Sequence, residues 1–259
     1  MNNLENFLEV TGTNRLKEKT GGEGIKIAVL DTGCNIDNEQ IVYRYDFFDE
    51  SNSARDNANH GTSIVNIIQT IAPKSEIYII KILDDVGLGN MANLSTGLSL
   101  ANNLNVDIVC MSLGGWKKFS KTTIKGLQLL YKRGIMILSA VGNNNSNDIY
   151  YPSKYNEVLS VGGLSTDLNI RWKNSNYCRE TDIVALAEDV ETIDNELNKA
   201  IVNGTSFANA IVVGQVALMK SIDAELIDTD ILKYCSDSRR LETAKGFLNI
   251  NEFLEELNI

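Results

Sequence analysis

Histidine is almost missing from this 259-residue chain, in which His60 is the only one. Its side chain is the one whose unperturbed pKa lies near neutrality, so proton transfer by an imidazole would have to use it. The four cysteines lie far apart and form no C-x-x-C pair: Cys34, Cys110, Cys178 and Cys235. That spacing argues against a zinc cluster and thioredoxin chemistry, and it predicts reduced thiols in a cytosolic setting.

Long apolar runs are also missing, since no segment approaches the roughly 20 residues that span a bilayer. The start of the chain, MNNLENFLEV, lacks the basic and apolar regions of a signal peptide. With a net charge of −10 the chain shows no basic stripe for phosphates, which argues against nucleic acid or an anionic membrane as a partner. We therefore expect a cytoplasmic protein, acting as a monomer, with no nucleic-acid or membrane partner.

Proline is scarce as well, with only Pro73 and Pro152, and no linker, repeat or low-complexity tract interrupts the chain. The length suits one α/β domain with a substantial core. The sequence therefore predicts a single domain over residues 1–259, of which residues 1–20 form an N-terminal segment.

Short apolar runs rich in Val and Ile recur between helix-like stretches. The runs are Ile25–Leu30, Ile77–Leu83, Asp107–Leu113, Ile135–Ala140 and Val158–Val161. The helix-like stretches are Ser63–Ile71, Met91–Leu104, Ser120–Lys132 and the almost wholly apolar Ser206–Ser221. Runs that are apolar on both faces are typical of central parallel strands. The alternation predicts an α/β doubly wound sandwich, with a central, mostly parallel sheet, helices on both faces and a site beyond the strands' carboxyl ends.

Three reactive side chains fall at a strand end or a helix start. Asp31 follows the first strand, His60 precedes an apolar helix, and Ser206 begins the buried helix. Each alone has a simpler interpretation, as a turn, surface or capping residue. Together, in the order Asp–His–Ser, they supply a nucleophile, a base and a carboxylate that would orient the base. A helix start also favours developing negative charge.

From about Thr20 to about Ile250, the chain resembles the subtilisin-like serine proteases (subtilase, peptidase S8 family). The resemblance rests on segments in the family's order: VLDTG, NHGTS, IAP, KILDDVGLGNM, DIVCMSLGG, SAVGNNN, YPSKY, SVGG and NGTSFA. It implies a subtilisin-like three-layer sandwich and a serine endopeptidase that cleaves peptide or protein substrates. The catalytic residues it implies are Ser206 as nucleophile, His60 as base, Asp31 as the base's orienter and Asn143 as oxyanion-hole donor.

The resemblance also assigns residues to the substrate cleft. They are Gly87, Leu88, Gly89, Met91, Ser112, Leu113, Gly114, Ala140, Gly142 and Tyr150. The substrate backbone would lie between the two glycine-containing edges as an added strand. Tyr150 falls where relatives often carry a small residue at the floor of the S1 pocket, so we expect a small or polar P1 residue. Asp84 and Asp85 flank one edge and favour a basic P2 or P4 residue.

Two features depart from many secreted relatives. The segment after His60, SIVNIIQT, runs straight into IAP, without the inserted loop that completes a tight calcium site in those relatives. We expect no required cofactor and no tight family calcium site, and weak cation sites remain open. Residues before Asp31 match only the start of a mature domain, so we expect no encoded propeptide.

A cytosolic protease without a propeptide needs narrow specificity, which favours selective processing of a leader peptide or a partner protein. The alternative is a catalytically silent module of the same fold that binds a peptide or protein.

Overall fold

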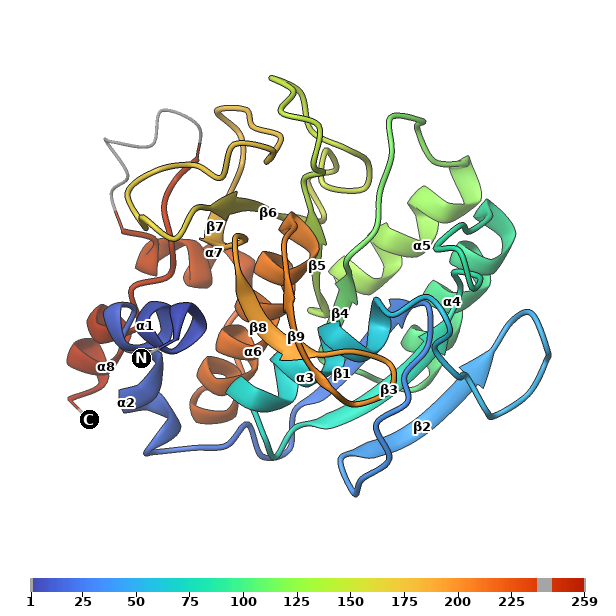
Figure 1. Cartoon of the computed structure of the whole chain (residues 1–259), viewed down its shortest axis with the longest axis horizontal. Coiled ribbons are helices and arrows are strands. Elements are labelled where there is room, and N and C mark those ends of the chain that lie inside the picture. The colour runs from blue at the N-terminus through green and yellow to red at the C-terminus, as the bar shows by residue number, and fades with distance from the viewer. Residues whose placement is uncertain (1, 237–243, 259) are drawn as a thin grey trace.

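The computed structural model describes residues 2–236 and 244–258 and is built around one seven-stranded sheet (Figure 1). The sheet's strands are β1 (Lys26–Asp31), β2 (Ile41–Asp46), β3 (Glu76–Lys81), β4 (Ile108–Met111), β5 (Met136–Ala140), β6 (Leu159–Leu164) and β7 (Ile183–Leu186). They lie in the order β2-β3-β1-β4-β5-β6-β7, and every neighbouring pair is parallel. The remaining two strands, β8 (Val190–Ile193) and β9 (Lys199–Val202), form a separate antiparallel hairpin.

Helices cover both faces of this sheet. They are α1 (Asn3–Val10), α2 (Thr13–Lys17), α3 (Gly61–Ile71), α4 (Met91–Asn103), α5 (Lys121–Lys132), α6 (Thr205–Ile222), α7 (Asp228–Ile231) and α8 (Ile250–Leu257), with a 3-10 turn at Leu232–Tyr234. Helices α4 and α5 pack together on one face, while α3 and α6 pack together on the other (Figure 1).

The central strand β1 shows why both faces need helices. Ile27 and Val29 belong to the apolar cluster that contains α3 and α6, while Ala28 and Leu30 belong to the cluster that contains α4. Successive side chains of a strand point to opposite faces, so a strand that is apolar throughout must be covered twice. The predicted α/β sandwich, with its mostly parallel central sheet, is confirmed.

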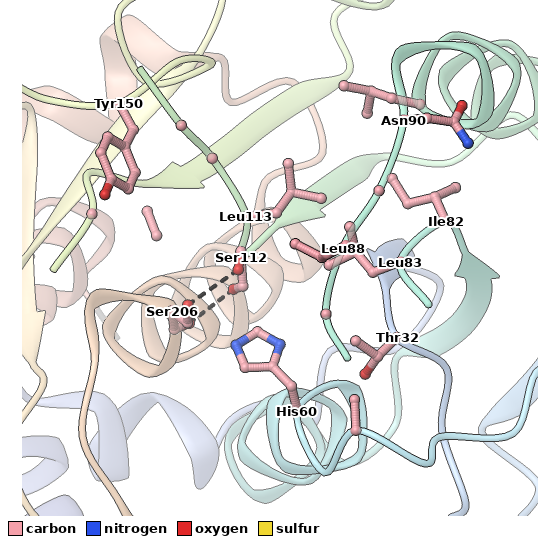
Figure 2. Close-up of a pocket in the computed structure, with 18 of the residues that line it drawn as sticks. Thr32, His60, Ile82, Leu83, Leu88, Asn90, Ser112, Leu113, Tyr150 and Ser206 are labelled. Atoms are coloured by element: carbon pink, nitrogen blue, oxygen red, sulfur yellow. Dashed lines mark hydrogen bonds between the residues drawn. The ribbon is translucent and has the colours of Figure 1, made fainter. Parts of the chain in front are cut away.

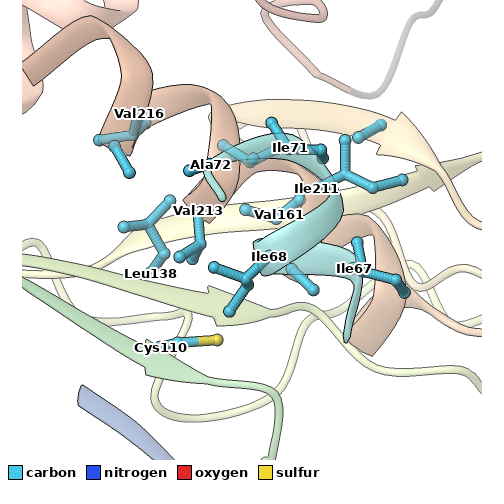
Figure 3. Close-up of a cluster of buried hydrophobic side chains, with 14 of the residues drawn as sticks. Ile67, Ile68, Ile71, Ala72, Cys110, Leu138, Val161, Ile211, Val213 and Val216 are labelled. Atoms are coloured by element: carbon cyan, nitrogen blue, oxygen red, sulfur yellow. The ribbon is translucent and has the colours of Figure 1, made fainter. Parts of the chain in front are cut away.

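Helices α3 and α6 are in close contact at Gly214. A Cβ atom added to Gly214 would lie 2.8 Å from the Cβ of Ile71. Figure 3 shows Ile71 and its neighbours on α3 packed against α6, above strand residues such as Leu138. The contact joins the tenth residue of α6 to the last residue of α3, and the first turns of the two helices also meet, because the His60 and Phe207 rings are 5.7 Å apart. The two helices therefore run side by side in the same direction.

Helix α6 is the core helix that its apolar sequence predicted. By length and composition alone it could cross a membrane, but 83% of it is buried inside the fold. Such burial is characteristic of the central helix of a packed domain rather than of a segment that faces lipid.

We expect the substitution Gly214→Ala to destabilise the protein by about 1–3 kcal/mol, because the added methyl group overpacks the contact with Ile71. Gly126→Ala on α5 is the matched control, since its Cβ would meet Leu98 at an ordinary 3.5 Å. There the better helix propensity of Ala predicts a gain of up to about 1 kcal/mol. Urea unfolding measures both free energies, and equal stability of the two variants would contradict the close packing.

Candidate active site

The structure brings Asp31 and His60 into direct contact. Asp31 ends β1 and its side chain is 1% exposed, whereas His60 immediately precedes α3 and is 28% exposed. The Nδ1 atom of His60 lies 2.7 Å from Oδ1 of Asp31, and that oxygen also accepts a hydrogen bond from the Thr32 N–H. Because a carboxylate only accepts, the proton of this contact belongs to Nδ1, and Nε2 is left as the basic nitrogen.

Glycine allows the two motif loops to approach this closely. A Cβ atom on Gly61 would lie 2.1 Å from the backbone oxygen of Gly33, so no side chain fits between the loops. The Gly61 N–H donates to Oγ1 of Thr32 at 2.9 Å. Contacts of Gly61 with Thr32 and Gly33 therefore hold the two segments together, which fixes the separation of Asp31 and His60.

A second buried carboxylate, Asp56, organises the loop that carries His60. Its side chain is fully buried and accepts hydrogen bonds from the Thr32 hydroxyl at 2.9 Å and from the Thr62 N–H at 2.8 Å. It also accepts from the backbone N–H groups of Ala58 and Asn59, each at 3.0 Å. Asp56 is not among the residues predicted from the sequence, because an acidic residue in a polar stretch is typical of an exposed loop. The signal present was its position four residues before the lone histidine.

The β8–β9 hairpin also contacts this loop. The Asn195 side chain donates to the backbone oxygen of Asp56 at 3.2 Å, and its own carbonyl accepts from Asn35 at 2.9 Å. Strand β9 leads directly into Ser206. The hairpin thus connects the loop before the histidine to the segment before the serine.

The pKa of His60 lies above its ordinary value of 6.5. Burial disfavours the charged imidazolium and lowers the pKa, but the charge and hydrogen bond of Asp31, together with the charge of Asp56, outweigh that effect. The two carboxylates therefore stabilise the protonated form of this histidine.

Ser206 is the second residue of α6, and its side chain lies beside the His60 ring. Its hydroxyl donates to the Ser112 carbonyl at 3.1 Å, and the Ser112 hydroxyl donates to the Ser206 carbonyl at 2.8 Å. Figure 2 shows these two hydrogen bonds and the His60 ring beside Ser206. The serine hydroxyl therefore lies between the base and the end of β4.

Asn143 is anchored through its side-chain oxygen. That oxygen accepts from the Thr205 N–H at 2.9 Å and from the Thr205 hydroxyl at 2.8 Å. With Oδ1 held in this way, the amide nitrogen Nδ2 is the atom left to donate, and it lies 3.5 Å from the ideal Cβ position of Gly204. The donor is thus fixed next to the start of α6.

A cleft of about 680 Å³ joins these groups. His60, Asn143 and Ser206 line it, and Asp31 lies buried behind His60. All ten residues predicted for the cleft line it too: Gly87, Leu88, Gly89, Met91, Ser112, Leu113, Gly114, Ala140, Gly142 and Tyr150. Trp116 and Phe119, which the sequence analysis did not assign, line it as well.

Tyr150 lies between the two segments that form the cleft floor. A Cβ atom on Gly142 would lie 2.6 Å from its ring, and one on Gly114 would lie 3.1 Å from its Cβ. The Trp116 ring packs edge-on against it, with 4.6 Å between the ring centroids. The tyrosine, labelled in Figure 2, therefore occupies space between Gly114 and Gly142.

The two acidic residues at the opposite edge are already engaged within the chain. Asp84 accepts from the backbone N–H groups of Val86 and Leu88, at 3.0 and 2.8 Å. Asp85 accepts from Lys81 at 3.0 Å, and this hydrogen bond lowers the pKa of its carboxyl. Lys81 offsets the charge of Asp85, so the expected preference for a basic P2 or P4 residue rests on Asp84 and stays a prediction.

The fold and the cleft have the form of a serine-type hydrolase, and the comparisons identify its family. Residues 22–235 match the family model described as the Subtilase family. An intracellular serine protease of Paenibacillus polymyxa is 30% identical over 89% of this chain and 77% of that protein. The major intracellular serine protease of Bacillus subtilis is 31% identical over 79% and 70%. The chain belongs to the subtilase family, and the predicted enzyme class, a subtilisin-like serine endopeptidase, is confirmed.

A solved structure supports the fold independently. The crystal structure of a cold-adapted subtilisin-like serine proteinase superposes with a TM-score of 0.76, at 24% identity, over 89% of this chain and 88% of the other. The subtilisin-like fold predicted from the sequence is confirmed.

Because His60 is the only histidine, its imidazole can be titrated alone by NMR. We expect a midpoint above 6.5 in the native chain, and a lower one in Asp56→Asn, because the substitution removes a negative charge that favours the imidazolium. Asp37→Asn is the control, since the Asp37 side chain is 98% exposed and its ion pair with Arg44, at 3.8 Å, lies away from His60 among the described residues. An Asp56→Asn midpoint equal to that of the native chain would contradict the assigned role.

Proposed function

We propose that this chain hydrolyses peptide bonds through an acyl-enzyme on Ser206, with an Asp31–His60–Ser206 triad, and that it is a selective processing protease. The observation that carries the proposal is the 2.7 Å hydrogen bond between buried Asp31 and the lone histidine, whose ring lies beside Ser206. No second function is supported by a comparable observation, and the comparisons give no support to a catalytically silent module.

In the proposed reaction Nε2 of His60 takes the proton of the Ser206 hydroxyl as the oxygen attacks the substrate carbonyl. The leaving amine then receives that proton from His60, which leaves the acyl group on Ser206. Water then attacks the acyl group as His60 takes its proton, and His60 returns that proton to the Ser206 oxygen as the acid product departs. Asp31 accepts the hydrogen bond from the Nδ1–H of His60 throughout, and it stabilises the imidazolium that forms during acylation and again during deacylation.

Two donors are available to the tetrahedral oxygen. One is Nδ2 of Asn143, whose oxygen partner Thr205 fixes its direction. The other is the Ser206 N–H in the first turn of α6, where the helix dipole also favours negative charge. Loss of one such donor typically costs about 10²–10³ in kcat.

The resting hydrogen bond from Ser206 to Ser112 has to break before the attack. A rotation about the serine Cα–Cβ bond would turn the hydroxyl away from the Ser112 carbonyl and toward His60. Catalytic hydrogen bonds often form fully only when substrate is bound, so the resting geometry is compatible with this mechanism.

Selectivity is supported by Tyr150. Its position between Gly114 and Gly142 reduces the space in which a P1 side chain would sit. A large aromatic P1 residue would have to displace both Tyr150 and the Trp116 ring packed against it. The proposed enzyme therefore accepts small or polar P1 residues, a restriction suited to processing a leader peptide or one partner protein.

The proposed setting is the cytoplasm, with the chain acting as a single-domain monomer. Two relatives are named intracellular serine proteases, and all four cysteines, which lie within the described residues, are unpaired. Catalysis of this type requires no cofactor. Only four residues, 72–75, separate α3 from β3, which supports the expected absence of the calcium loop of secreted relatives at this point.

Replacing Ser206 or His60 by Ala should lower kcat for a peptide substrate by about 10⁴–10⁶, because the two groups act as one unit. Ser99→Ala, on the exposed side of α4, should leave the rate unchanged. Hydrolysis of a fluorogenic peptide measures the rates, and circular dichroism checks that each variant is folded. Substantial hydrolysis by Ser206→Ala would overturn the mechanism.

Products from denatured cell-extract proteins, identified by mass spectrometry, should show few cleavage sites with small or polar P1 residues. Tyr150→Ala should raise kcat/KM for a Phe P1 peptide relative to an Ala P1 peptide by roughly tenfold or more, because the vacated volume admits the ring. Widespread cleavage after Phe or Tyr by the native enzyme would contradict the proposed selectivity.

A further inference from the structure

Positive charge is concentrated in one part of this acidic chain. Residues 108–147 contain no Asp or Glu, although the chain as a whole has a net charge of −10. The same stretch contains six basic residues: Lys117, Lys118, Lys121, Lys125, Lys132 and Arg133. The net charge of the whole chain does not reveal this local excess of positive charge.

Four of these lysines follow directly from the wall of the substrate cleft. Ser112–Gly114 forms that wall, and the chain continues through Trp116 to Lys117, which lines the cleft itself. Lys118 is exposed next to it, and Lys121 and Lys125 lie one turn apart at the start of α5, also exposed. We call Lys117, Lys118, Lys121 and Lys125 the basic rim.

No carboxylate of the described residues lies within ion-pair distance of any lysine of the basic rim. The neighbouring Lys154 differs, because it pairs with Asp148 at 2.7 Å. Unpaired lysines at the rim of a cleft leave their charge available to a bound ligand.

The start of α5 adds to this positive potential. A helix N-terminus carries a partial positive charge and usually has acidic residues in its first turn, which stabilise it. The first turn of α5 has none and begins instead with Lys121. A positive charge in the first turn opposes the helix dipole and lowers the stability of the helix. The position of Lys121 beside the cleft is therefore better explained by binding of a ligand than by folding.

The direction of the substrate follows from the proposed chemistry. His60 has to protonate the leaving amine, so the residues after the scissile bond lie on the His60 side. In Figure 2 the wall runs from Ser112, beside Ser206, to Leu113, away from His60, and it therefore meets the residues before the scissile bond. The basic rim lies beyond that wall, where P4 and the residues before it would be placed.

We propose that the basic rim recognises acidic residues on the N-terminal side of the cleavage site, at P4 and beyond. This inference rests on the proposed function for the direction of the substrate. At the opposite edge, the charge of Asp85, which would repel such residues, is offset by its ion pair with Lys81 at 3.0 Å. The overall charge of −10 repels acidic peptides in general, so the attraction is confined to peptides that align with the rim.

Binding to the full-length Ser206→Ala variant tests the inference without cleavage. The probes are two fluorescein-labelled decapeptides that carry Ala at P1 and differ only in having Glu or Gln at P4, P5 and P6. Exposed ion pairs are individually weak, so we expect the Glu peptide to bind about 3- to 10-fold more tightly at low salt. That advantage should shrink as the salt concentration rises.

The double substitution Lys117→Gln/Lys118→Gln should abolish the advantage of the Glu peptide, so that the Glu and Gln peptides bind this variant with equal Kd. Lys19→Gln/Lys132→Gln is the matched control, because it also removes two positive charges from exposed positions. Lys19 lies in the turn after α2, and Lys132 is the last residue of α5. Fluorescence anisotropy gives each Kd. An equal effect of the two double variants would overturn the inference, because the effect would then come from net charge alone.

The outcomes for the rim and for the proposed function are distinguishable. If the native enzyme cleaves both peptides with equal kcat/KM and both bind Ser206→Ala equally, the protease stands and the rim proposal fails. If the Glu peptide binds preferentially through Lys117 and Lys118 but the native enzyme cleaves neither peptide, the rim stands and the proposed function fails. Lysine-dependent binding of single-stranded DNA, with no preference for the Glu peptide, would also overturn the rim proposal.

Discussion

The parallel packing of α3 against α6 is the constraint on which the site depends. The contact between Ile71 and Gly214 sets the distance between the two helices, and the shared direction places both N-termini at one edge of the sheet. His60 precedes one helix and Ser206 begins the other, so their separation is fixed by core packing. Because β1 ends at the same edge, the Asp31 side chain lies close enough to accept a hydrogen bond from His60. Buried apolar side chains thus determine the geometry of the polar groups.

The electrostatics of the site follow from the same arrangement. Two buried carboxylates, Asp31 and Asp56, act on a single imidazole, and the pKa of His60 is raised although burial alone would lower it. Asp56 also holds the loop before α3 through backbone N–H groups, so one side chain provides both charge and position. On the other side, Thr205 fixes the oxygen of Asn143. The groups that would stabilise developing charge, His60 and Asn143 among them, are therefore oriented before substrate arrives, and only the Ser206 hydroxyl has to rotate.

The sequence predicted the central strands, the main helices and the residues of the cleft, because these depend on apolar runs and on motifs at strand ends. It did not predict β2 or β7. Strand β2 lies at the edge of the sheet and is half exposed, so its sequence IVYRYD mixes polar and apolar residues, and β7 has only four residues. The role of Asp56 and the place of Tyr150 between two glycines depend on contacts between distant segments. Local patterns carry no information on such contacts.

The central claim, that His60 activates Ser206, is tested most directly by the rate at which a fluorophosphonate probe modifies the enzyme at different pH values. Intact-mass spectrometry gives the rate, and peptide mapping locates the adduct. The account predicts one equivalent of probe on Ser206, with a rate that rises with pH at the same midpoint as the NMR titration of the His60 imidazole. Labelling at another residue, or a rate on Ser206 that does not follow the titration of His60, would contradict it.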